Sequence, residues 1–130
     1  MVSIFTKIIR GDIPSYKIHE NNNNLAFLDI NPIVKGHVLV VPKKEESYIF
    51  DLEKEIYLDL WSFAKEISIA MKKVIHCERI AVVVAGFDVP HTHIHLIPVN
   101  NMSEINFESD KLLFTDDEFR QIMKLIKSAI

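Results

Sequence analysis

One stretch of the chain, from Asp51 to Val74, constrains the fold more than any other. Its apolar residues recur at spacings of three and four, and no proline or glycine interrupts it. This periodicity gathers the apolar side chains on one face of an α-helix. The apolar positions are Leu52, Ile56, Leu60, Phe63, Ile67, Met71 and Val74. The sequence therefore predicts one long amphipathic helix that covers the core of the protein.

Five shorter apolar segments predict strands before and after this helix. They are rich in β-branched and aromatic residues, and residues typical of turns separate them. The segments are residues 16–19, 25–29, 37–42, 79–85 and 92–99, with Asn21 to Asn24 predicted as a hairpin loop between the first two. Strands that group around one long helix, instead of alternating with several, indicate an α+β fold with a mostly antiparallel, five-stranded sheet.

Both ends of the chain carry helix signals. Ser3 can cap a short helix that Gly11 ends. Near the other end, Thr115 and Glu118 have the spacing of a capping box and predict a C-terminal helix. The sequence has no repeat and no linker, and its 130 residues are too few for two ordinary domains. We therefore expect a single domain over residues 1–130.

Composition excludes several classes of partner. The net charge is -3 and no basic cluster exceeds the pair Lys43 and Lys44, so we expect no nucleic-acid partner. No apolar run approaches the roughly 20 residues of a membrane span, so we expect no membrane partner. The N-terminus does not resemble a signal peptide, and the single cysteine, Cys77, cannot form an internal disulfide. These features favour a cytoplasmic protein.

The main candidate for a functional site is the run His91-Thr-His93-Ile-His95. In the strand predicted there, the three histidines would project to one side at intervals of roughly 7 Å. Thr92, Ile94 and Leu96 would then face the core. Three neighbouring imidazoles repel one another if charged and leave polar atoms unpaired if buried, so a functional reason for the cluster is expected.

Three interpretations of the cluster are open from the residues alone. The histidines could line a solvated strand, they could bind zinc, or one neutral imidazole could attack phosphorus while the others hold phosphate oxygens. Zinc sites commonly include acidic partners, and the neighbouring segment offers only Asp88. Phosphate chemistry is favoured because His37 opens a buried strand that could lie beside the cluster, and Gly86 permits close approach of the backbone to a ligand.

The sequence also resembles a known family. The run His91-Thr-His93-Ile-His95-Leu-Ile resembles the His-φ-His-φ-His-φ-φ signature of histidine-triad nucleotide-binding proteins. Residues 4–9, 13–14, 26–32 and 36–43 are similar to other blocks of this family in order and spacing. The resemblance covers the chain from residue 4 to about residue 99, and its nearest branch is that of the nucleoside phosphoramidases.

This resemblance implies a histidine-triad fold, a homodimer and a purine nucleotide substrate. The family cleaves the α-phosphate of phosphoramidates or dinucleoside polyphosphates through a nucleotidyl-histidine, and releases a nucleoside monophosphate. By position, His93 would be the nucleophile, His91 and His95 would contact or orient the phosphoryl group, and His37 would support them from the adjacent strand. No cofactor is implied. A nucleotide-binding regulatory or scaffold protein with little turnover is the alternative.

The resemblance also implies a nucleoside site. The residues that would line the base pocket are Phe5, Ile8, Ile13, Phe27 and Ile30. Asp29 would accept hydrogen bonds from the ribose hydroxyls, although a carboxylate before Asn31-Pro32 could instead cap the turn.

Two departures from the family pattern bear on the chemistry. The family commonly has Gly-Gln-Ser/Thr before the histidines, and this chain has Gly86-Phe87-Asp88. Because a carboxylate repels an anionic group, we hypothesise that Asp88 favours a substrate with an amine leaving group over a polyphosphate. In addition, Ser3 and Thr6 stand where some bacterial members have the cysteines of a zinc site, so no metal is expected.

Overall fold

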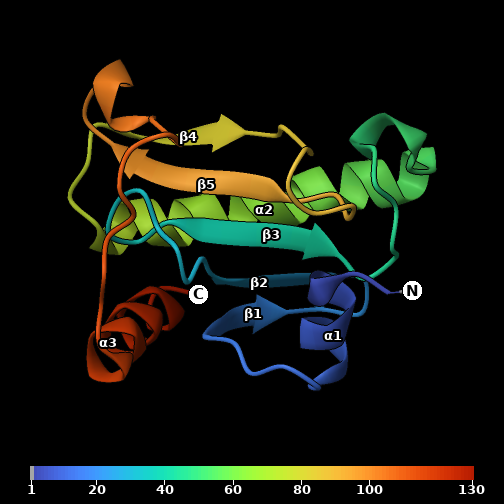
Figure 1. Ribbon diagram of the computed structural model, residues 1–130, viewed down its shortest axis with the longest axis horizontal. Helices are drawn as coiled ribbons and strands as arrows, with labels where there is room; N and C mark the ends of the chain where they lie inside the picture. Colours follow the sequence, from blue (N-terminus) through green and yellow to red (C-terminus); the bar gives the residue numbers. More distant parts are fainter. Residues whose placement is uncertain (1) are drawn as a thin grey trace.

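The structure, a computed structural model, describes residues 2–130 (Figure 1). The elements follow one another as α1 (Ile4–Arg10), β1 (Lys17–Glu20), β2 (Asn24–Leu28), β3 (Val38–Pro42), η1 (Ile49–Asp51), α2 (Lys54–Val74), β4 (Arg79–Val83), β5 (Ile94–Val99), η2 (Met102–Glu104) and α3 (Asp116–Lys127). The two η elements are short 3₁₀ helices. The long helix, the C-terminal helix and all five strands of the prediction are therefore present.

The strands form one five-stranded sheet in the order β1-β2-β3-β5-β4. Every neighbouring pair is antiparallel, which confirms the predicted α+β class. The register puts His95 of β5 between Leu39 of β3 and Val83 of β4. This position in the middle of the sheet fixes one histidine of the triad on rigid backbone.

Helices cover both faces of the central strands. In Figure 1, α2 lies behind the sheet and α1 lies in front of it. Alternate residues such as Val38, Val40 and Ile94 pack with α2 and α3, whereas Leu39 and Val41 pack with α1. Strands β2, β3 and β5 are buried along their whole length. Burial on both faces explains why their sequences read as nearly continuous apolar runs.

The caps of the first and last helices are as predicted. The hydroxyl of Ser3 accepts a hydrogen bond from the backbone N–H of Thr6 at 3.0 Å, and Gly11 ends α1 in the left-handed conformation. Thr115 and Glu118 form the reciprocal capping box of α3. These local hydrogen bonds are readable from sequence because they depend on residues only three apart.

The start of β5 and the asparagine loop differ from the prediction. The strand begins at Ile94 and not at Thr92, because the N–H and hydroxyl of Thr92 donate to the carbonyl of Glu46 at 2.7 and 2.8 Å. Asn24, predicted in the hairpin loop, belongs to β2 and is fully buried. Its side-chain amide donates to Asp59 at 2.8 Å, which provides a partner for this buried polar group. Both differences arise from long-range partners that a local pattern does not contain.

The other boundaries shift by a few residues. Helix α2 begins at Lys54, since Asp51 closes the 3₁₀ turn η1, and β4 ends at Val83 instead of residue 85. Within residues 2–130, none of the helices is both long enough and apolar enough to cross a bilayer.

Candidate active site

The functional side chains come from the ends of three neighbouring strands. Asp29 directly follows β2, His37 directly precedes β3, and His91 and His93 lie in the segment that leads into β5. His95 lies within β5, on the sheet face that α1 covers. Since β2, β3 and β5 are adjacent, the sheet itself brings these residues together. All four predicted histidines are buried.

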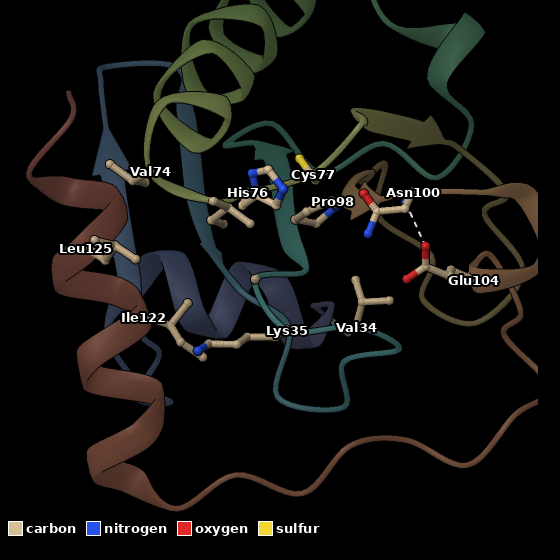
Figure 2. A pocket seen from close by; sticks show the side chains of 12 residues that line it. Val34, Lys35, Val74, His76, Cys77, Pro98, Asn100, Glu104, Ile122 and Leu125 are labelled. Atoms are coloured by element: carbon tan, nitrogen blue, oxygen red, sulfur yellow. Dashed lines mark hydrogen bonds between the residues drawn. The ribbon is translucent and has the colours of Figure 1, made fainter.

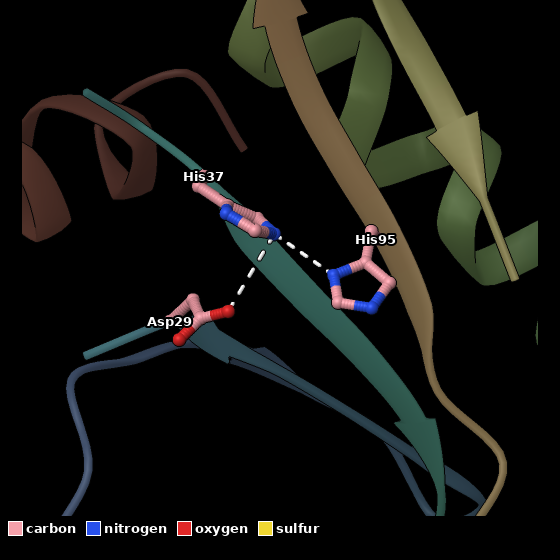
Figure 3. Close-up of side chains that lie close together, drawn as sticks. All are labelled: Asp29, His37 and His95. Atoms are coloured by element: carbon pink, nitrogen blue, oxygen red, sulfur yellow. Dashed lines mark hydrogen bonds and ion pairs between the residues drawn. The ribbon is translucent and has the colours of Figure 1, made fainter. Parts of the chain in front are cut away.

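The pair His37 and His95 is joined directly (Figure 3). Nε2 of His37 lies 2.9 Å from Nδ1 of His95 and 3.6 Å from a carboxylate oxygen of Asp29. The backbone N–H of Ile33 donates to Nδ1 of His37 at 3.3 Å, so in the neutral ring the hydrogen is on Nε2. That hydrogen is donated to Nδ1 of His95. His95 therefore carries its own hydrogen on Nε2, where it can be donated to a ligand.

His93 has the tautomer opposite to that of His95, with its hydrogen on Nδ1. Its Nδ1 lies 2.7 Å from the carbonyl oxygen of His91, which can only accept, so Nδ1 carries the hydrogen. Nε2 is then left with a free electron pair in the neutral ring. Among the described residues, Nε2 of His93 is buried and has no hydrogen-bond partner. A buried, unpaired imidazole nitrogen is unusual in a folded protein and is the arrangement that a nucleophile requires.

Both nitrogens of His91 bond to the protein. Nε2 donates to the carbonyl of Pro42 at 2.8 Å, and Nδ1 accepts from the hydroxyl of Ser3 at 2.7 Å. This ring therefore has no nitrogen available for a ligand. The bonded ring holds the backbone carbonyl that orients His93, and the predicted contact of His91 with a phosphoryl group would require one of these two hydrogen bonds to break.

A polar network of Ser3, Thr6 and Glu45 holds α1 against the site. The sequence pattern did not indicate a role for these residues at the site. Glu45 accepts hydrogen bonds from the backbone of Ser3 at 2.6 Å and from the hydroxyl of Thr6 at 2.7 Å. These hydrogen bonds lower the pKa of Glu45 to about 2. Because Ser3 also bonds to His91, the network links α1 to the histidines. The network engages the hydroxyls of Ser3 and Thr6, and neither residue offers the thiolate that a zinc site at this end of α1 would use.

Burial favours the neutral form of three of the imidazoles. It lowers the pKa of His37 and the pKa of His95 to about 4, and it also lowers the pKa of His91. The ring of Phe5 lies edge-on to His93 with 5.0 Å between centroids. The ring of Phe107 lies against His95 with 4.9 Å between centroids. Phe107 comes from the irregular segment before α3, where no local pattern in the sequence indicates a site residue.

A pocket of about 200 Å³ adjoins His93 and His95. All seven predicted substrate-binding residues line it, namely Phe5, Ile8, Ile13, Phe27, Asp29, Ile30 and Asp88. His37 and His91 do not line it, since they lie behind the other two histidines and bond to them. The rings of Phe5 and Phe27 meet edge-on at 5.7 Å between centroids and form an apolar wall.

The two acidic residues of the pocket are held differently. One oxygen of Asp29 accepts a hydrogen bond from the backbone N–H of Asn31 at 2.8 Å, so this carboxylate does cap the turn. Burial raises the pKa of Asp29, and its other oxygen lies toward His37. Asp88 is largely exposed, and one of its oxygens lies 3.2 Å from Nε2 of His93, outside the hydrogen-bonding direction. A carboxylate thus stands next to the candidate nucleophile.

The geometry argues against a metal at either histidine cluster. Asp29, His37 and His95 have ligand atoms within 4.8 Å of one another. However, the hydrogen bond between the two rings occupies the nitrogens that would have to face the metal. The triad itself offers only His93 and His95, because both nitrogens of His91 are bonded.

A separate cavity of about 360 Å³ lies between α3 and the C-terminal end of α2 (Figure 2). Its lining includes Lys35, His76, Cys77 and Ile122 but none of the four histidines above. It therefore has no contact with the candidate nucleophile.

Comparison with known proteins identifies the family. The HIT domain, which takes its name from the histidine triad, matches residues 10–102. The chain belongs to the HIT family. An uncharacterized HIT-like protein of Borreliella burgdorferi is 33% identical over 98% of this chain and 97% of its own length. The adenosine 5'-monophosphoramidase of Schizosaccharomyces pombe is 39% identical over 78% of this chain and 77% of its own length.

A solved structure gives the same result for the fold. A HIT-like protein of Bartonella henselae, described as involved in cell-cycle regulation and as carrying an unknown ligand, superposes with a TM-score of 0.86 at 28% identity. The alignment covers 98% of this chain and 96% of that one. The HIT fold therefore extends over the C-terminal segment with Phe107, which lies outside the matched residues 10–102.

The buried histidines predict an acid-sensitive fold. Unfolded imidazoles bind protons near pH 6.5, whereas His37 and His95 do so only near pH 4, so the unfolded chain binds more protons in this window. The free energy of unfolding should fall as the pH is lowered from 6.5 to 4, by on the order of 3 kcal/mol for either imidazole. Asp29, with its raised pKa, opposes part of this loss. Urea unfolding between pH 7.5 and pH 4.5 measures the slope.

The variant His37→Gln should flatten this slope, and the variant His76→Gln, at an exposed position, should not. Equal slopes for wild type and His37→Gln would contradict the assignment of acid sensitivity to the buried pair.

Proposed function

We propose that this HIT protein is a nucleotide hydrolase or transferase that acts on the α-phosphate of purine nucleoside phosphate derivatives through His93. The observation that carries the proposal is the buried Nε2 of His93, which has a free electron pair and no hydrogen-bond partner among the described residues. The similarity to an adenosine 5'-monophosphoramidase, at 39% identity, supports the same reaction class.

The reaction has two displacement steps at phosphorus. In the first, Nε2 of His93 attacks the α-phosphorus, the bond to the leaving group breaks, and the leaving atom takes up a proton. In the second, water attacks the phosphorus of the nucleotidyl-histidine and the N–P bond breaks, which releases a nucleoside monophosphate and restores the free imidazole. His95 supports both steps, because the hydrogen on its Nε2 can be donated to a phosphoryl oxygen.

The hydrogen bond from Nδ1 of His93 to the carbonyl of His91 also stabilises the reaction. Attack by Nε2 puts positive charge on the imidazole, and the carbonyl accepts the hydrogen of the charged ring. Ser3 and Pro42 hold His91 from both sides, so the carbonyl is in position before the substrate binds. Such preorganisation lowers the reorganisation needed in the transition state.

The nucleoside is proposed to bind in the 200 Å³ pocket. The rings of Phe5 and Phe27 with Ile8 offer an apolar surface for the base, and the carboxylate of Asp29 is an acceptor for ribose hydroxyls. One oxygen of Asp29 already bonds to Asn31, which leaves the oxygen that faces His37 for the ribose.

We also propose that the protein forms a homodimer through the edge strand β4. This strand ends the sheet order, so one of its sides has no strand partner among residues 2–130. Val82 of β4 and Leu58 and Ile69 of α2 are about half exposed. Pairing of two β4 strands would satisfy the open edge.

Replacement of the nucleophile is the direct test of the reaction. Wild type incubated with adenosine 5'-phosphoramidate should release AMP and give a transient adenylylated adduct by mass spectrometry. His93→Ala should lower AMP release by at least about a thousandfold and abolish the adduct, because Nε2 of His95, the other imidazole that lines the pocket, carries hydrogen and has no electron pair for attack. His76→Ala, far from the pocket, is the matched histidine control.

Two outcomes would contradict the mechanism. One is AMP release that survives His93→Ala, and the other is activity that a chelator removes. Nucleotide binding without AMP release from any derivative would favour the alternative of a regulatory or scaffold protein.

The position of Asp88 predicts a preference for amine leaving groups. A carboxylate 3.2 Å from Nε2 of His93 attracts a leaving amine as it becomes protonated and repels a departing polyphosphate. The ratio of kcat/KM for an adenosine phosphoramidate to kcat/KM for a dinucleoside polyphosphate should fall by about tenfold or more in Asp88→Ser. Asp110→Ser, which removes a charge from an exposed loop, controls for net charge. An unchanged ratio in Asp88→Ser would refute this role.

A further inference from the structure

Three aromatic side chains are exposed next to the candidate nucleophile. Phe87 is 97% exposed, Phe50 67% and Tyr48 57%. The rings of Tyr48 and Phe50 meet edge-on with 5.4 Å between centroids. Exposed rings that gather in one place mark binding surfaces more often than isolated ones do. Phe87 belongs to none of the core clusters of the described residues, so packing in the core does not explain an aromatic side chain at this position.

These rings line a hollow of about 350 Å³, which we name the aromatic hollow. Its wall is formed by residues 47–50, residues 84–87, Thr92 and His93. His93 is thus common to the aromatic hollow and to the nucleotide pocket. Asp88 lines the nucleotide pocket and directly follows Phe87, so it lies at the boundary between the two.

We propose that the aromatic hollow binds the leaving group of the substrate, and that this leaving group is an amine with an aromatic or bulky apolar substituent. The inference rests on the proposed function, because it assumes a nucleotide bound at His93. His93 lines both the nucleotide pocket and the aromatic hollow. When the phosphorus lies at His93 and the nucleoside fills the nucleotide pocket, the leaving group can therefore reach the aromatic hollow.

The chemistry of the hollow selects an apolar amine over a second nucleotide. Its volume exceeds what ammonia would occupy, and aromatic rings stack with other rings and attract cations through their faces. Among the residues that the structure describes in its wall, none is lysine or arginine, so a polyphosphate would find no counter-charge there. Asp88 adds a negative charge beside the reacting atoms, where the amine nitrogen becomes protonated.

The bond changes are the ones proposed above for His93. The P–N bond breaks as the bond between phosphorus and Nε2 forms, and the amine nitrogen keeps the electron pair and takes up a proton from water. The free amine leaves through the aromatic hollow, and a second water hydrolyses the nucleotidyl-histidine.

The test compares two substrates that differ only in the amine. Values of kcat/KM are measured for adenosine 5'-phosphoramidate and for its N-phenethyl derivative, with wild type, Phe87→Ala and Phe50→Ala. Wild type should prefer the phenethyl compound by about tenfold or more, and each variant should reduce this ratio at least about threefold. Leu113→Ala, which removes an apolar side chain that is 95% exposed elsewhere, should leave the ratio unchanged.

Any other result overturns the proposal. The pattern of turnover also shows whether the aromatic hollow alone or the proposed reaction as a whole is wrong. Turnover of both compounds with no preference, or with a preference that neither variant alters, refutes the aromatic hollow and leaves the proposed function intact. No AMP from either compound refutes both. Dissociation of a dimer by Phe87→Ala in sedimentation experiments, with equal losses on the two substrates, would assign the rings to a subunit interface instead.

Discussion

The hydrogen bond from Nδ1 of His93 to the carbonyl oxygen of His91 is the interaction on which the account of the site depends. At 2.7 Å it fixes one tautomer of a buried ring and leaves Nε2 with a free electron pair. The remaining hydrogen bonds follow from it. Those of His91 to Ser3 and Pro42 hold the carbonyl in place, and those of His37 and Ile33 give His95 the opposite tautomer. Two neighbouring imidazoles are thus prepared as an acceptor and a donor.

This arrangement explains the requirement for a rigid, doubly covered sheet. Burial favours the neutral form of His37, His91 and His95, and most nitrogens of buried imidazoles need hydrogen-bond partners. Strands β3 and β5 supply the backbone, α2 closes one face, and α1 closes the other with Phe5 against His93. Glu45 ties the first turn of α1 to the same network. The stability of the fold and the hydrogen-bonding state of the candidate nucleophile, His93, are therefore coupled.

Much of this was predictable from the sequence. The long helix, the capped end helices and the α+β class follow from periodicity and short-range caps, and six of the seven pocket residues follow from family blocks; Asp88 was singled out because it departs from them. The tautomers were not predictable, because they depend on backbone carbonyls and N–H groups that only the folded chain brings near the rings. Phe107 was missed for the same reason, since an irregular segment places it on His95.

Two residues beside the candidate nucleophile bear on the choice of leaving group. Phe87 is almost fully exposed, and a carboxylate oxygen of Asp88 lies 3.2 Å from Nε2 of His93. Gly86 turns the backbone here with a φ of 84°, which a side chain would disfavour. The turn therefore directs an aromatic ring and a carboxylate to different pockets, and our proposal of an apolar amine as the leaving group rests on these two features.

The most direct test of the central claim is the tautomer of each ring in solution. Long-range ¹H–¹⁵N correlation spectra of the ¹⁵N-labelled protein at neutral pH distinguish a nitrogen that carries hydrogen from one with a free electron pair. We expect hydrogen on Nδ1 and a free electron pair on Nε2 for His93, with the reverse for His95. Hydrogen on Nε2 of His93, or a free pair on Nε2 of His95, would contradict it.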